Sequence, residues 1–473
     1  MPEWKFDLSQ YDSVWKLVVN VGLLLIALLA GNALRRSVPF MRKAFIPSAL
    51  IGGLILFIIN VLCTQFAGVR IVDKRIMQII TYHALGIGFI GMTLKTVEKS
   101  KQKHGLKVVQ NGLLTGGTYM LQAVVGLLIT LIFYWAGSGL FYDSGVILPL
   151  GYGQGPGNAL TWDLNFTALT HEPEFTLPAV FDGEGSFGLT IASVGFIVAS
   201  IVGVIYINIF KSKGQINPRV AVLERKVADF EGNNEIEDSE SVDKTTIQMA
   251  LVALAYAMSF GIMFFFSKLT DWTGVKLFND VAWGFNFIWG VVTATLIKAS
   301  LRFCEKRNVV RARYINNYQM DRISGFAFDM MIIAGVAAID IAVVAKYVWV
   351  IIILCLVGAI VTFFYVYLMC KKCFGSYAHE AFLLNFGTLT GTASNGMILL
   401  REIDPNFETP IGNIYILSQF PAMVAVAPLL LLLNMGAKSL TGCLITLAVF
   451  AALFVAYTIV MLITSKIKAP AQE

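Results

Sequence analysis

Two glycine-rich stretches decide how this chain folds. The first, Ser144–Trp162, has the sequence SGVILPLGYGQGPGNALTW, and the second, Ala378–Leu400, has the sequence AHEAFLLNFGTLTGTASNGMILL. In each stretch apolar flanks surround a small, polar tip, and neither flank reaches the roughly 20 residues that a membrane span needs. The alternating glycines and the proline of the first tip are incompatible with a helix. We therefore predict two re-entrant hairpins.

The tips of these hairpins are the predicted binding site. Broken backbone at membrane depth leaves N–H and C=O groups unpaired, so it persists only inside protein or beside water. The freed N–H groups can bind a carboxylate and the carbonyls a cation. Side-chain hydroxyl and amide oxygens at the tips suit a hard cation better than a transition metal. The predicted substrate- and ion-binding residues are Gly151, Gly153, Gln154, Gly155, Gly157, Asn158, Gly387, Thr388, Thr390, Gly391, Thr392, Ser394 and Asn395.

The composition indicates that the bilayer surrounds this chain. Of its 473 residues, 57% are hydrophobic and only 14% are charged, whereas soluble proteins carry about 25% charged residues. The exterior of a soluble protein must be wetted, so a soluble enzyme, a nucleic-acid binder and a disordered chain are excluded. The six cysteines are scattered along the sequence and do not form a disulfide framework.

Apolar runs long enough to span a bilayer lie on both sides of the two hairpins. We predict eleven spans, at Trp15–Leu34, Ala44–Cys63, Ile76–Leu94, Val108–Trp135, Ser186–Phe210, Ile247–Phe266, Val281–Leu296, Ile323–Ala345, Tyr347–Cys370, Ile411–Asn434 and Leu440–Thr464. The chain is thus expected to be an all-α polytopic membrane protein.

The lysines and arginines orient these spans. If the N-terminus lies outside, 27 of the 36 basic residues fall in cytoplasmic segments, as the positive-inside rule requires. An even number of spans, or the opposite orientation, would remove this bias. We therefore predict an outside N-terminus and a cytoplasmic C-terminus.

A polar stretch, residues 211–246, divides the chain. It begins basic, becomes acidic and has few large apolar residues, which is typical of a linker. The flanking halves, 1–210 and 247–434, each contain four spans, a hairpin (144–162 or 378–400) and a fifth span. Five spans separate the hairpins, so the hairpins enter from opposite faces and the halves are inverted repeats. Residues 435–473 add one transmembrane helix and a tail.

Two carboxylates within the eighth predicted span are further site candidates. Asp329 and Asp340 are eleven positions apart, which places them within roughly 20° of one helix face. Carboxylates inside a membrane are rare and usually functional, so both are candidate ligands for sodium or a proton. By contrast, the glycine patterns Gly86–Gly91 and Gly112–Gly116 lie inside apolar helices and indicate close helix packing.

At its hairpins the chain resembles the bacterial sodium/glutamate symporter family. The matching pieces are Ile46–Gly53, Gly151–Ala159, Asn385–Gly387 and Ala393–Asn395, and the likeness extends roughly from Leu17 to Asn434. It implies two inverted repeats of five transmembrane helices and one re-entrant hairpin each. It also implies a homodimer in the bacterial inner membrane, with glutamate as substrate, sodium as coupling ion and no cofactor. Gln154, Pro156 and the threonine series of the second tip depart from the family pattern, as do the linker and the extra last helix.

We therefore expect sodium-coupled symport of a small anionic substrate, glutamate being favoured, by alternating access. The candidate sodium ligands are Asp329, Thr390, Thr392, Ser394 and Asn395. Two alternatives remain: a sodium- or proton-coupled carrier for another small carboxylate, and a passive channel, which would need a continuous polar pore. The sequence has no HExxH, GxSxG or phosphate-loop motif, so we do not expect an enzyme.

Overall fold

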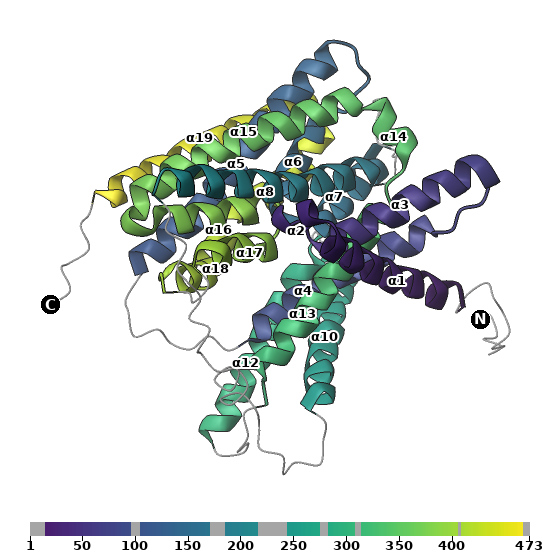
Figure 1. The fold of residues 1–473 in the computed structure, drawn as a ribbon, viewed down its shortest axis with the longest axis horizontal. Helices are drawn as coiled ribbons and strands as arrows, with labels where there is room; N and C mark the ends of the chain where they lie inside the picture. Colours follow the sequence, from purple (N-terminus) through teal and green to yellow (C-terminus); the bar gives the residue numbers. More distant parts are fainter. Residues whose placement is uncertain are drawn as a thin grey trace. The chain divides into compact units, whose positions relative to one another are not determined.

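The described part of the chain is helical throughout. The computed structural model describes residues 15–95, 105–170, 185–215, 244–274, 282–307, 314–404 and 408–466, and all regular structure in these ranges is helix (Figure 1). Ten of the helices are long and apolar enough to cross a membrane, so the chain is a multi-pass membrane protein. Most of the predicted 211–246 linker lies outside the described residues.

The ten long apolar helices confirm ten of the eleven predicted spans, with shifted ends. They are α1 (Lys16–Ser37), α3 (Ser48–Ala67), α4 (Lys74–Leu94), α5 (Gly105–Trp135), α8 (Ser186–Ser212), α10 (Lys244–Thr273), α12 (Asn286–Lys306), α15 (Val348–Cys373), α18 (Ile411–Lys438) and α19 (Leu440–Ser465). The largest shift is in α12, which continues well past the predicted end at Leu296. The shorter elements are α2 (Pro39–Lys43), η2 (Tyr142–Val146), α6 (Ile147–Gln154), α7 (Pro156–Thr170), α14 (Ile341–Lys346), η3 (Gly375–Tyr377), α16 (Ala378–Thr390) and α17 (Ala393–Ile403).

The eighth predicted span, Ile323–Ala345, is wrong as one continuous helix. Helix α13 (Asn317–Ala337) ends before Asp340, whose backbone is extended, and α14 follows. The Asp340 carboxylate accepts a hydrogen bond from Ala342 N at 3.0 Å and so caps α14, a position that aspartate favours over a helix interior. Asp329 and Asp340 therefore do not share one helix face, and the prediction that they do is also wrong.

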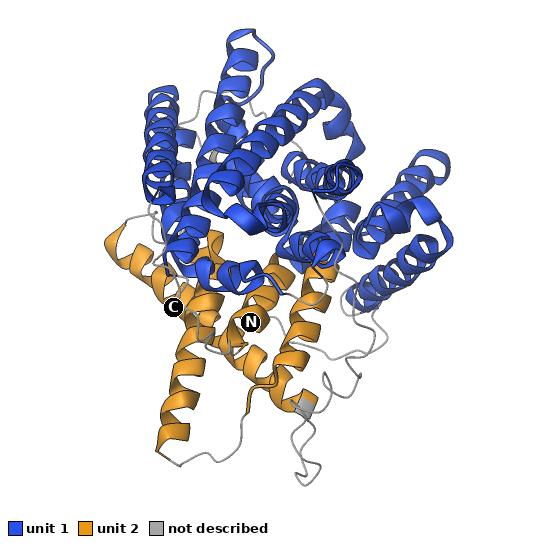
Figure 2. Ribbon diagram, turned by 60° about the vertical axis from the view of Figure 1, so that its left-hand side comes forward, with its two compact units in different colours: residues 1–81, 104–219, 332–473 blue, residues 82–103, 220–331 orange. Residues whose placement is uncertain are grey.

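The chain divides into two compact units (Figure 2). One comprises residues 1–81, 104–219 and 332–473, and the other comprises residues 82–103 and 220–331. These units do not coincide with the two predicted halves, because each unit contains helices from both.

The smaller unit has its own apolar core. Side chains of α4, α10, α12 and α13 form this core, and its buried members are Ile90, Leu94, Val252, Ala255, Ala294, Ile297 and Met320. Methyl groups on Gly86 and Gly88 would collide with the rings of Tyr256 and Phe328, at 2.9 and 2.7 Å. The predicted role of the 86–91 glycines in close helix packing is thus confirmed.

In the larger unit, α5 is surrounded by other helices. It packs against α15, α18, α19, η2 and α6. Gly112 and Gly116 bring its backbone against Pro421 and Ala425 of α18, where a methyl group would approach to 2.7 and 2.5 Å. The predicted packing role of this glycine pair is therefore confirmed.

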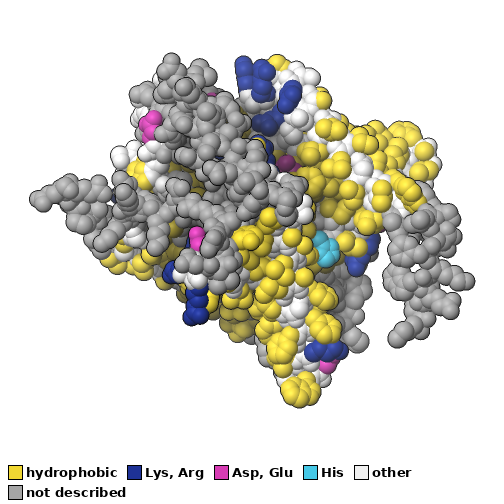
Figure 3. All heavy atoms as spheres, turned by 90° about the horizontal axis from the view of Figure 1, so that it is seen from below, with side chains coloured by type: hydrophobic (Ala, Val, Ile, Leu, Met, Phe, Trp, Pro, Cys, Tyr) yellow, Lys and Arg dark blue, Asp and Glu magenta, His cyan; other side chains and the backbone are white. Residues whose placement is uncertain are grey.

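Large apolar side chains remain exposed on the long helices. On α15, Trp349, Ile353, Leu356, Ile360 and Phe364 recur every three or four residues and are all exposed, so they form one stripe along the helix. Figure 3 shows one face of the molecule, on which apolar side chains cover broad areas and lysine and arginine form a few patches. Such surfaces are compatible with lipid and not with water.

Gly126 of α5 tests the importance of close packing. A methyl group there would lie 2.1 Å from the carbonyl oxygen of Gly145, whereas one on Gly22 of α1 would meet nothing within 4 Å. Gly126→Ala should therefore cost about 1–3 kcal/mol through overpacking, while Gly22→Ala should be neutral or stabilising by up to about 1 kcal/mol through helix propensity. Thermal unfolding in detergent measures both variants. Equal changes in thermal stability in the two variants would show that the contact between Gly126 and Gly145 is not tightly packed.

Candidate functional site

The first hairpin is a pair of helices that meets at one glycine. Helix α6 ends at Gln154, Gly155 follows with a φ of 78°, and α7 begins at Pro156. This left-handed φ favours glycine, and proline suits the first position of the helix that follows. The prediction that all four alternating glycines would exclude a helix is wrong, because Gly151 and Gly153 lie within α6 and Gly157 lies within α7.

Those helical glycines allow close packing of α6 against its neighbours. A methyl group on Gly151 would lie 2.8 Å from the Ile191 side chain of α8, and one on Gly153 would lie 2.1 Å from the Tyr119 ring of α5. A glycine inside a helix costs about 1 kcal/mol relative to alanine, and burial of the surrounding helices offsets this cost here.

The second hairpin is broken over two residues. Helix α16 ends at Thr390, Gly391 and Thr392 leave the helical conformation, and α17 begins at Ala393. Its two arms approach closely, because a methyl group on Gly387 would lie 2.8 Å from the Cα of Gly396. Both predicted hairpins are therefore helix–break–helix units.

Helix α8 brings the two hairpins together. A methyl group on Gly195 would lie 2.4 Å from the carbonyl oxygen of Thr390 and 3.0 Å from the Tyr152 ring. Both α6 and α16 pack against α8, and they also pack against each other. Segments more than 200 residues apart in sequence therefore meet at one glycine.

Helix α5 holds the second hairpin by an amide side chain. Gln122 donates from Nε2 to Thr362 Oγ1 at 2.8 Å and to the Leu389 carbonyl at 3.0 Å. Asn111 accepts a hydrogen bond from Asn385 Nδ2 at 2.9 Å. These α5 residues, together with Tyr119 and Gly195, were missed by the sequence analysis. For Asn111 and Gln122, a polar residue within an apolar helix was the signal in the sequence that could have identified them.

Several predicted site residues already have hydrogen-bond partners. Thr388 and Thr390 each donate at 2.7 Å to the carbonyl four residues earlier, and Asn158 Nδ2 donates to Gln154 Oε1 at 2.6 Å. Ser394 is exposed, and its neighbour Asn395 is buried. At the tips, some polar side chains therefore already form hydrogen bonds, while the Ser394 side chain is accessible.

Other buried polar atoms at the hairpins and on α5 lack a partner among the described residues. They include Asn158 Oδ1, Asn385 Oδ1, Thr392 Oγ1, Asn395 Nδ2 and Gln122 Oε1, and also Gln110 Oε1 on α5 and Asp163 Oδ1 and Asn165 Nδ2 on α7. A buried unpaired group costs about 1–3 kcal/mol. Most of these atoms are acceptor oxygens, so the set can bind a cation, and the amide nitrogens of Asn165 and Asn395 are donors for an anion.

The predicted carboxylate ligands lie elsewhere. Asp329 is a half-buried residue of α13 in the smaller unit. Asp340 belongs to the larger unit, where its backbone N–H donates to Ser186 Oγ at 2.9 Å in addition to its capping role. The proposed ligand roles of both remain predictions. Within the described ranges, no three His, Cys, Asp or Glu side chains gather as a metal site, and the cysteines are all free.

A buried aspartate in the second arm of the first hairpin, and another directly after the second hairpin, pair with backbone N–H groups near the start of the next long helix. Asp163 of α7 accepts a hydrogen bond from Gly188 N at 2.7 Å, in the first turn of α8. Asp404, directly after α17, accepts from Glu408 N and Thr409 N, each at 2.9 Å, before α18. A carboxylate at a helix N-terminus pairs with free N–H groups and with the helix dipole.

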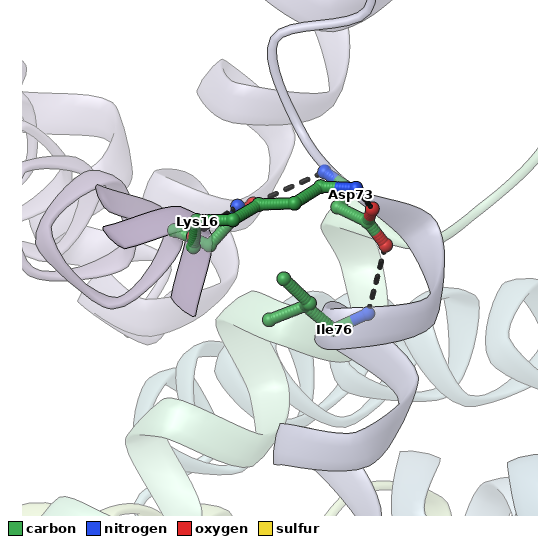
Figure 4. A network of polar contacts seen from close by, with 4 residues as sticks. Lys16, Asp73 and Ile76 are labelled. Carbon is green, nitrogen blue, oxygen red and sulfur yellow. Dashed lines mark hydrogen bonds and ion pairs between the residues drawn. The ribbon is translucent and has the colours of Figure 1, made fainter. Parts of the chain in front are cut away.

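One pocket lies away from the tips. It has a volume of about 660 Å³ and contains basic side chains from α1, the loop after α3 and the start of α4, namely Lys16, Arg70, Lys74 and Arg75. Asp73 pairs with Lys16 and accepts from Ile76 N at 3.0 Å (Figure 4). The hydrogen bond from Lys16 lowers the pKa of Asp73. The pocket is therefore positively charged, and it would attract anions.

No protein-family model matches the chain, and no curated protein matches it.

Asp163 should stabilise the fold through α8. Asp163→Ala leaves the Gly188 N–H unpaired and should cost about 1.5–3 kcal/mol, the contribution of a hydrogen bond to a charged group. Asp163→Asn keeps an acceptor oxygen and should cost less. Thermal unfolding in detergent compares both with Asp271→Ala, since Asp271 is an exposed carboxylate. A loss no larger than that of the control would show that the contact is not stabilising.

Proposed function

We propose that this protein is a sodium-coupled secondary transporter of a small anionic substrate, with glutamate as the first candidate. The observation that carries the proposal is the meeting of two broken helices on α8, with unpaired buried acceptor oxygens at both breaks. Broken helices in corresponding positions of two halves are typical of transporter binding sites. The basic pocket beside α1 and α4 favours an anionic substrate.

The packing of the helices supports two inverted repeats of five spans and one hairpin, with α19 as the extra helix. In chain order α1, α3, α5 and α8 correspond to α10, α12, α15 and α18. The contacts follow this correspondence: α1 packs on α3 and α10 on α12, while α5 packs on α18 and α15 on α8. In this proposal α13 corresponds to α4 and is the eleventh span, despite the charged residues Asp321, Arg322 and Asp329.

The protein would act as a homodimer in the bacterial inner membrane. Alternating access would expose the tips to one side at a time, and substrate and sodium would pair with groups that are otherwise unpaired. A carrier that uses protons or another small carboxylate is the alternative. A passive channel is disfavoured, because unpaired polar atoms gather at the two breaks, whereas a channel needs a continuous polar pore.

Reconstitution tests the proposal directly. Proteoliposomes should accumulate labelled glutamate, or another small carboxylate from a panel, only with an inward sodium gradient. Unlabelled substrate inside should accelerate uptake, because a carrier shows counterflow and a channel does not. Uptake that ignores both sodium and internal substrate would overturn the proposal, and uptake driven by a proton gradient alone would select the alternative.

Thr392→Val tests the second break as a sodium site. The variant removes the unpaired hydroxyl and keeps the shape of the side chain. Loss of one ion ligand should raise the sodium concentration for half-maximal uptake at least about tenfold, because such a contact contributes roughly 1.5–3 kcal/mol. The control is Thr295→Val, at an exposed position of α12 whose hydroxyl donates to Val291 O at 2.7 Å. An unchanged sodium requirement in Thr392→Val would remove Thr392 from the site.

The orientation of the proposed topology can be tested by labelling. Single cysteines are placed at the exposed positions Asp271 and Lys306, in a background without the six native cysteines. These positions lie at the C-terminal ends of α10 and α12, which the proposed topology places on opposite sides of the membrane. An impermeant thiol reagent added outside intact cells should label position 271 and leave position 306 unlabelled, because the basic residues favour an outside N-terminus. The reverse pattern would show the opposite orientation.

A further inference from the structure

A carboxylate that the proposed transport site does not use lies in η2, just before the first hairpin. Asp143 is completely buried, and both of its carboxylate oxygens lack a hydrogen-bond partner among the described residues. In this respect it differs from Asp163 and Asp404, which are equally buried but accept hydrogen bonds from backbone N–H groups. Burial without a hydrogen bond needs a physical explanation.

The carboxylate lies against the junction of α18 and α19. A methyl group on Gly436 would be 2.7 Å from Asp143 Oδ1 and 3.0 Å from Oδ2. The neighbouring Tyr142 hydroxyl donates to the Ala437 carbonyl at 2.8 Å, and Thr130 Oγ1 of α5 donates to the Tyr142 carbonyl at 2.9 Å. The backbones of Gly126 and Gly145 are also in close contact. Thus η2 is held between α5 and the α18–α19 junction, with the carboxylate inside.

No positive charge on the described residues neutralises this carboxylate. The elements that pack against η2 are α5, α6, α18 and α19. Their titratable and charged side chains are Lys107, Tyr119 and Tyr134 of α5, Tyr152 of α6, Tyr415 and Lys438 of α18, and Cys443 and Tyr457 of α19. Of the two lysines, Lys107 binds the Cys373 carbonyl, and Lys438 is exposed and forms no ion pair within the described ranges. The group that interacts directly with the carboxylate is the Cys443 thiol.

An ionised carboxylate in such a place would be very costly. Transfer of an unpaired charge into a low-dielectric interior costs far more than a folded protein can offset, so the charge must be paired or removed. The Cys443 thiol is only a weak donor and cannot balance a full charge. Among the described residues no backbone N–H, ion pair or cluster of metal ligands meets the carboxylate. A bound proton removes the charge without requiring any further ligand.

We propose that Asp143 is a proton-binding site, and that the bound proton keeps η2, and with it the first hairpin, seated against α18 and α19. The carboxylate takes one proton from solvent when this arrangement forms and returns it when the arrangement opens. An ionised Asp143 would need water, which the contacts at Gly436 and Cys443 exclude. Seating of the first hairpin is thereby linked to pH.

The sign of the linkage follows from proton counting. The seated state holds a proton that an aspartate in water releases near its ordinary value of about 3.9. Because the folded state then binds more protons than the unfolded state, stability must fall as pH rises. One such group changes the unfolding constant by up to about tenfold for each pH unit.

Infrared spectroscopy of the full-length protein tests the proposal without a transport assay. Detergent-solubilised wild type at neutral pH should show the carbonyl stretch of a buried, protonated carboxylic acid, and Asp143→Asn should lose that contribution. Asp271→Asn, at an exposed carboxylate, should leave it unchanged. The absence of a difference between wild type and Asp143→Asn would overturn the proposal.

Thermal unfolding as a function of pH provides a second, independent measurement. The wild-type midpoint should fall as pH rises, while that of Asp143→Asn should fall less, because the amide resembles the protonated acid and cannot ionise. Parallel pH profiles would contradict proton binding. Stabilisation by sodium that is present in wild type and lost in Asp143→Asn would also overturn the proposal, by assigning the site to a metal ion. Since neither measurement involves uptake, failure of the proton-site proposal is distinguishable from failure of the transport proposal.

Discussion

The structure depends on one constraint: backbone polar groups that leave a helix inside a membrane must be enclosed by protein. Gly155 and the Gly391–Thr392 pair each interrupt a helix within an apolar part of the chain. Helices α5 and α8 provide the enclosure. They can do so because glycines at the contacts allow backbones and rings to approach where a single methyl group would collide, as at Gly195 and Gly153. The glycines at these contacts therefore serve to enclose the two breaks.

The same constraint explains how polar side chains are distributed. Around the second break, Gln122 and Asn111 both fix α16 through hydrogen bonds, and Gln122 leaves its Oε1 unpaired. The fixed atoms make the site rigid, and the unpaired atoms make it able to bind a ligand. A site of this kind gains free energy from a ligand that supplies the missing partners, because unpaired polar groups are most costly in a low-dielectric interior.

Three buried aspartates show how their surroundings decide the role of a carboxylate. Asp163 accepts a hydrogen bond from the first turn of α8, and Asp404 accepts hydrogen bonds from backbone N–H groups just before α18, so both act as anchors. Asp143 meets a glycine backbone and a thiol, and neither carboxylate oxygen has a hydrogen bond within the described ranges. All three are aspartates next to a hairpin, and their chemical differences arise from the elements that surround them.

The sequence alone determined the membrane environment, ten of the spans and the positions of both broken segments, because hydropathy, span length and glycine clusters are local properties of the chain. It missed the break between α13 and α14, and it treated the helical Gly151 and Gly153 as helix breakers. The helical glycines depend on non-local packing, because burial against α8 and α5 offsets their cost. The start of α14 depends on the local Asp340 cap and on the long-range hydrogen bond from Asp340 N to Ser186 Oγ. The meeting of the two tips at Gly195 and the isolation of Asp143 were decided only by the tertiary structure. Contacts between residues 200 or more positions apart leave no periodic signal in the sequence, so only the packed helices bring these groups together.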